Sequence, residues 1–152
     1  WFTSVRHFSP ADCWNNSYAS CLMQQQLSED ERSVLKWIDQ HTSPSDSLYV
    51  GVANHDLFTT NYVSFYFITQ RRPATRYHEL HPGVTTTRAV QLEMIKELQN
   101  NAPPVIILSS NFKREPNLSA KDDAVDLLDM YIRAHYRNEA TFGIFSVWTK
   151  LE

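Results

Sequence analysis

The sequence predicts an α/β fold, with a small, mostly parallel sheet and helices on its faces in a Rossmann-like layered sandwich. Two short apolar runs, residues 48–52 and 105–109, have the length of buried strands. Segments with helical spacing of apolar residues alternate with these runs, as crossovers in a parallel sheet require. The 152 residues, 42% hydrophobic and 20% charged, are typical of one globular domain.

Three parts are expected along the chain. Residues 1–27 should form an irregular leader or linker, because aromatic residues are scattered there among polar ones without a period. Residues 28–150 should form a single α/β domain. Residues 151–152 are Leu-Glu, a pair often left by an expression tag, and we expect them to lie outside the fold. The first residue is Trp rather than Met, which favours a piece of a larger protein.

The domain should open with a helix followed by a strand. Ser28 and Glu31 have the spacing of a capping box, in which each side chain bonds to the other residue's backbone N–H. The helix that begins there should end near His41, because a proline three residues later restricts the backbone before it. After a turn, residues 48–52 form the first buried strand.

Residues 62–69 fit two structures. Their β-branched and aromatic content suits a strand, whereas Asn61 suits the cap of a helix. We favour the helix, because a parallel sheet needs a crossover before its next strand. That next strand is expected at residues 75–79, after the turn at Pro73.

The second half should contain two helices and two strands. Residues 85–87 offer caps for a helix that ends near Asn101, with an apolar face made of Val90, Met94, Ile95 and Leu98. Residues 105–109 form a buried strand. Another helix should begin at Ser119, with an inner face made of Val125, Leu128 and Ile132. The last strand, residues 141–149, fits an antiparallel partner, and Gly143 fits a bulge because the apolar phase shifts there.

His55 and Asp56 directly follow the first predicted strand. Ligands of open α/β sheets bind outside the carboxyl ends of the strands, so the pair lies where a site is expected. It could act as a general base with its orienting carboxylate, or as two metal ligands. The alternative is structural: Asp56 caps the following segment and His55 bonds to backbone.

A second polar cluster follows the predicted crossover. Its arginines could clamp a phosphate or carboxylate, or pair with acidic residues of neighbouring helices. In an extended segment, Arg76 and His78 would share one face. Together with the first pair, this cluster provides the candidate binding residues: His55, Asp56, Arg72, Arg76, His78 and His81.

Several functional classes find no support in the sequence. The net charge of −3 and the lack of a basic run argue against nucleic acid as a partner. Three glycines cannot supply a dinucleotide fingerprint, and no Gly-x-Ser-x-Gly or His-Glu-x-x-His motif occurs. Cys13 and Cys21 lack the spacing of a zinc site, so no metal is expected. They fit a short-loop disulfide or two free thiols equally well.

Several strings resemble the soluble C-terminal region of bacterial membrane glycosyltransferases related to the dolichyl-phosphate-mannose protein mannosyltransferases. The resemblance spans residues 31–149 and excludes the leader. It includes an Arg-x-Pro motif after the crossover, here Arg71 to Pro73. The strings are residues 50–56, Asn61 with 63–67, 71–78, 82–86, 114–119 and 127–132.

The resemblance implies that the parent transfers a sugar from a polyprenyl-phosphate donor to an acceptor. It places the parent in the cytoplasmic membrane and this domain on the extracytoplasmic, periplasmic side. Catalytic acidic residues of such enzymes lie on loops between membrane helices near the N-terminus. The resemblance therefore carries no catalytic residue onto this chain, and the isolated domain is expected to have no activity or cofactor. Its expected partners are the membrane-embedded part of its own chain and the acceptor substrate.

Two rival interpretations remain open. The first is a free-standing enzyme or ligand-binding domain that uses His55 and Asp56. The second is a protein-interaction module that presents the aromatic residues Trp1, Trp14 and Tyr18.

Overall fold

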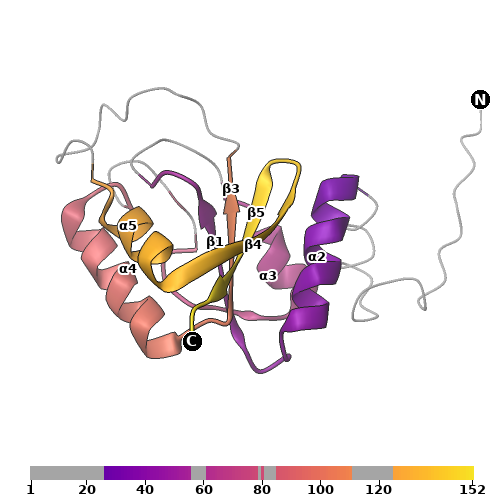
Figure 1. Ribbon diagram of the computed structural model, residues 1–152, viewed down its shortest axis with the longest axis horizontal. Coiled ribbons are helices and arrows are strands. Elements are labelled where there is room, and N and C mark those ends of the chain that lie inside the picture. Colours follow the sequence, from indigo (N-terminus) through magenta and orange to yellow (C-terminus); the bar gives the residue numbers. More distant parts are fainter. Residues whose placement is uncertain (1–25, 56–60, 79, 81–84, 111–124) are drawn as a thin grey trace, which may run out of the picture.

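The computed structural model describes residues 26–55, 61–78, 80, 85–110 and 125–152 (Figure 1). The leader residues Cys13, Cys21, Trp1, Trp14 and Tyr18 lie outside these ranges, as do Asp56, His81 and Ser119. The described elements are, in order, α2 Glu29–His41, β1 Ser47–Val52, α3 Ser64–Thr69, β2 Arg72–Pro73, α4 Arg88–Asn101, β3 Val105–Ser109, α5 Leu127–His135, β4 Tyr136–Phe142 and β5 Phe145–Lys150. Within the described residues, no helix is both long and apolar enough to cross a bilayer.

The five strands form one mixed sheet in the order β2-β1-β3-β5-β4. Strand β1 is parallel to both β2 and β3, whereas β5 is antiparallel to both β3 and β4. The α/β class is therefore confirmed, and so is an antiparallel last strand. A mostly parallel sheet was too strong a prediction, because the C-terminal hairpin makes half of the strand pairings antiparallel.

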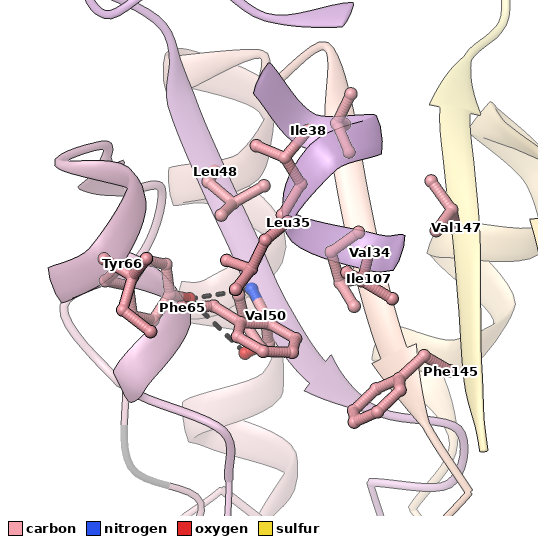
Figure 2. Packing of buried hydrophobic residues seen from close by; sticks show 12 residues of the cluster. Val34, Leu35, Ile38, Leu48, Val50, Phe65, Tyr66, Ile107, Phe145 and Val147 are labelled. Carbon is pink, nitrogen blue, oxygen red and sulfur yellow. Dashed lines mark hydrogen bonds between the residues drawn. The ribbon is translucent and has the colours of Figure 1, made fainter. Parts of the chain in front are cut away.

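Helices cover both faces of the sheet and create two cores. Helices α2 and α3 pack on one face, and α4 and α5 pack on the other (Figure 1). Side chains of β3 alternate between them, so that Ile107 joins the first core and Ile106 the second. In the first core, Val34, Leu35 and Ile38 of α2 pack over the sheet (Figure 2). Their helical spacing is the pattern that predicts this helix from the sequence.

Helix α2 confirms the predicted capping box. The Ser28 backbone N–H donates to Glu31 Oε2 at 2.7 Å, and the Glu31 N–H donates to Ser28 Oγ at 3.2 Å. Acidic residues fill the first turn, where the positive end of the helix dipole favours them. The helix ends at His41, as predicted.

Residues 64–69 form the favoured helix, but Asn61 is not its cap. The N-cap is Val63, and the Asn61 amide instead donates to the backbone oxygens of Val50 and His78. The buried hydroxyl of Tyr66 makes a further tie from α3 to β1 by bonding to the backbone of Val50 (Figure 2).

The strand predicted at residues 75–79 is wrong: β2 is shorter and earlier, at Arg72–Pro73. After β2, the Ala74 N–H still donates to Leu48 O, which continues the ladder by one bond. Beyond this point, side chains of α4 bond to the backbone: Asn101 donates to Ala74 O, and Glu97 accepts from the Arg76 N–H. With its backbone bonded to side chains of α4, the described part of this segment is not part of a strand.

Helix α4 confirms the predicted helix, although its buried face differs in detail. Met94 and Leu98 are buried, whereas Val90 and Ile95 lie at the edge of the second core. The third buried residue is polar: Gln91 is fully buried and bonds to the N-terminal end of α5.

Helix α5 begins later than predicted. Its first residue is Leu127, and Val125 precedes the helix instead of lying on its inner face. Gln91 explains this start, because its amide donates to Val125 O at 2.8 Å and its oxygen accepts the Leu128 N–H at 3.0 Å. Leu128 and Ile132 are buried, as predicted.

The C-terminal region is a hairpin rather than a single bulged strand. Gly143 lies in the turn with φ of +56°, a conformation that favours glycine. The apolar phase shifts at this point because the chain reverses direction. A register shift does occur, but it lies between Asn138 and Ala140 of β4. Leu151, expected outside the fold, donates its N–H to His135 O.

The capping box yields a stability prediction. Ser28→Ala removes the acceptor for the Glu31 N–H, so we expect the free energy of unfolding to fall by about 1 kcal/mol. Ser33→Ala is the matched control, because the Ser33 hydroxyl only donates back to Glu29 O within the helix. Urea denaturation followed by circular dichroism measures both variants. Equal losses in the two would contradict the capping assignment.

Candidate functional site

A buried network of three polar side chains lies at the carboxyl end of β1. His55 Nδ1 is 2.5 Å from Asp129 Oδ1, and the His55 backbone N–H donates to Asp129 Oδ2 at 3.1 Å. His55 Nε2 is 2.7 Å from the hydroxyl of Tyr49. Strand β1 therefore provides Tyr49, the turn after it provides His55, and α5 provides Asp129 from across the second core.

The hydrogen-bonding capacity of each side chain determines which groups donate and which accept in this network. A carboxylate only accepts, so His55 donates to Asp129 from Nδ1 as well as from its backbone nitrogen. In the neutral imidazole that carries its proton on Nδ1, Nε2 accepts the hydroxyl proton of Tyr49. Burial, followed by nearby Tyr66 and Asp129, raises the pKa of Tyr49 well above its usual value. Tyr49 is thereby kept in the form that donates.

The network differs from both interpretations of the His55–Asp56 pair. The carboxylate that orients His55 belongs to Asp129, 74 residues away, and Asp56 lies outside the described residues. The structural alternative expected His55 to bond to backbone, whereas among the described residues its two ring nitrogens bond to the side chains of Tyr49 and Asp129. Its side chain is 0% exposed, and each ring nitrogen has a protein partner. In this arrangement the imidazole connects β1 and α5.

Among the described residues, no group of three or more His, Cys, Asp or Glu side chains could hold a metal ion. Ser109 ends β3 at the same edge of the sheet. However, it pairs with Phe145 of the first core, so strand alternation turns it away from the face that holds Asp129.

Asn61 joins three segments near this network. Its amide nitrogen is 2.8 Å from Val50 O and 2.7 Å from His78 O, and its oxygen accepts the Tyr62 N–H. One 8%-exposed side chain thus connects β1, the start of α3 and the segment after β2. Buried amides need several partners, and this one has them.

The arginine cluster separates into two environments. Arg71 is buried, and its guanidinium donates to Thr69 O, Thr42 O and Asp39. Arg72 is exposed on β2. Arg76 is 61% exposed and pairs with Glu93 and Glu97 of α4. The expectation that these arginines pair with acidic residues of helices is confirmed for Arg71 and Arg76.

Arg76 and His78 line the same open hollow, which has a volume of about 490 Å³. The hollow lies between the segment after β2 and the last turns of α4. Its lining includes Pro73, Thr75, Arg76, His78, Glu97 and Asn101. Arg76 and His78 thus border the same hollow, but Thr75 borders it too and the segment is not a strand, so the strict alternation of an extended strand does not apply here.

The neighbouring side chain of Tyr77 helps to hold Arg76 in place. The Tyr77 hydroxyl donates to Glu93 Oε2 at 2.7 Å, and the Arg76 guanidinium lies over the Tyr77 ring. Hydrogen bonds from Tyr77 and then from Arg76 lower the pKa of Glu93. Glu93 therefore keeps its charge and holds Arg76 in place.

Sequence reasoning missed Asp129, Tyr49 and Gln91. The signal for Asp129 was present: on a helix it shares the inner face of Leu128 and Ile132, where a carboxylate needs a buried partner. That partner could not be identified, because it is distant in sequence. Gln91 likewise lies on the inner face of α4, three residues before Met94.

Comparison with known proteins gives a similarity in fold to a solved structure. No family model matches the sequence, and no curated protein matches it. Among solved structures, the chain is similar to the C-terminal globular domain of an oligosaccharyltransferase from Archaeoglobus fulgidus. The TM-score is 0.49 at 9% sequence identity, over 83% of this chain and 99% of that one.

The Asp129–His55 contact yields the second prediction. Asp129→Asn replaces one acceptor oxygen with an NH₂ group that faces a donor of His55. We therefore expect the free energy of unfolding to fall by about 3 kcal/mol. Thermal and urea denaturation measure the loss.

The control for this prediction is Asp39→Asn, the same change in a half-exposed carboxylate that pairs with Arg71 at 3.3 Å. Asp39 is open to solvent, and Arg71 keeps its hydrogen bonds to Thr69 O and Thr42 O in the variant, so we expect a loss of about 1 kcal/mol or less. If Asp129→Asn cost no more than Asp39→Asn, the network would not hold α5 to β1.

Proposed function

We propose that this chain is the non-catalytic, extracytoplasmic C-terminal domain of a membrane glycosyltransferase that uses a polyprenyl-phosphate-linked sugar donor. One observation carries the proposal: separate strings that resemble such enzymes meet in the folded domain. Asn61 bonds to Val50 and to His78, and Asp129 bonds to His55. These residues belong to four of the strings.

This meeting supports the resemblance because it gives the strings a joint physical role. Residues 50–56 provide the chain that leaves β1, and residues 71–78 provide the segment after β2. Residues 127–132 provide the helix that holds His55. A sequence that keeps all of these strings keeps one bonded unit at the carboxyl edge of the parallel strands, where ligands of α/β sheets bind.

The same geometry supports a non-catalytic role for the described residues of this edge. The side chains of His55 and Asp129 are 0% and 3% exposed, which suits a scaffold. This burial also disfavours the rival free-standing enzyme that would use His55 as a base. Arg76 and His78 are the candidate residues that face outward at a hollow. They are the ones we expect to meet the acceptor or the membrane part of the same chain.

Fractionation of source cells tests the proposal. An antibody raised against the domain should detect a membrane-bound protein several times larger than this 152-residue chain. Protease added from the extracytoplasmic side should remove the epitope. An antibody to a cytoplasmic protein is the control, because its antigen should survive the protease. A soluble band of about this chain's own size would contradict the proposal.

A further inference from the structure

The hollow between β2 and α4 has the size of a small-molecule site. Its volume of about 490 Å³ lies within the ~300–1,000 Å³ that is usual for such sites. The adjacent strand β2 has only two residues, and one of them is Pro73, which has no N–H to donate. Addition of an extended peptide to this edge is thereby disfavoured, so a compact ligand fits better.

The charges around the hollow favour a neutral ligand. Among its described lining residues, Arg76 and Glu97 carry opposite formal charges that cancel. The Arg76 guanidinium also pairs with Glu93, which Tyr77 holds from the other side. A phosphate would have to displace Glu93 and approach two carboxylates. This geometry argues against the anion clamp that the arginines first suggested.

The polar groups of the hollow suit hydroxyls. Glu97 is one-quarter exposed and offers carboxylate oxygens as acceptors. The side-chain amide of Asn101 donates to Ala74 O. The side-chain oxygen of Asn101 remains as an acceptor. Arg76 has five N–H donors in a planar fork, more than Glu93 and Tyr77 occupy. A vicinal diol both donates and accepts, so it can use a carboxylate and a guanidinium together.

Apolar atoms complete the surface. Pro73, which is exposed on β2, forms an apolar wall of the hollow next to these polar groups, and the buried Ala74 lies behind it. A sugar ring presents hydroxyls at its rim and C–H groups on its faces, so it can use both kinds of wall. We infer that the hollow between β2 and α4 is a binding site for a neutral saccharide. The inference rests on the hollow alone and holds whether or not the parent is a glycosyltransferase.

Nuclear magnetic resonance of the ¹⁵N-labelled 152-residue chain tests the inference. Maltose, mannobiose and N,N′-diacetylchitobiose are titrated separately, and inorganic phosphate is titrated in parallel. We expect at least one disaccharide to shift the amide signals of residues 74–78 and the Asn101 side chain. Phosphate should leave them in place. Shifts with phosphate alone, or with none of the disaccharides, would overturn the inference.

Variants of Glu97 connect the shifts to the hollow. Glu97→Ala should weaken disaccharide binding about tenfold, as loss of a charge-assisted hydrogen bond does. Glu139→Ala, which removes an exposed carboxylate on β4, should leave binding unchanged. Glu97→Gln keeps the shape and one acceptor, so it should bind with intermediate affinity and serves if Glu97→Ala does not fold. Unchanged binding in the folded Glu97 variants would contradict the inference.

Discussion

The carboxylate of Asp129 contacts two N–H groups of His55. The arrangement of the chain at the carboxyl end of β1 depends on this contact. Asp129 lies on the apolar side of α5, where an unpartnered carboxylate would be strongly unfavourable. His55 satisfies both oxygens and is itself held by Tyr49. Helix α5, strand β1 and the turn that leaves it are therefore fixed by one bonded group.

Polar side chains connect distant segments elsewhere in the fold as well. Gln91 sets the start of α5, Asn61 joins the end of β1 to the segment after β2, and Asn101 takes over where the β2 ladder stops. Each is a side chain that bonds to the backbone of a distant segment. The described part of the sheet has three parallel strands, which give the connections few ladder bonds, so these side chains supply the remainder. The strings that resemble membrane glycosyltransferases contain several of the residues involved.

The parts of the fold that could be predicted are those determined locally. The Ser28 capping box and the apolar run at 105–109 are complete within their own segments, and both lie where expected. Strand β2 was misplaced because α4 side chains decide where its ladder ends. The polar edge strand β4 lacks an apolar alternation to reveal it. At the site, the partner of His55 was missed because 74 residues separate it from Asp129.

A double-mutant cycle on His55 and Asp129 tests this account most directly. The two alanine variants and the double variant are compared with the parent chain by urea denaturation. We expect a coupling energy of at least about 2 kcal/mol, because removal of either partner already removes the contact. A coupling energy below about 0.5 kcal/mol would mean that the two residues stabilise the fold independently. In that case, the bonded group at the end of β1 would not be what holds this edge together.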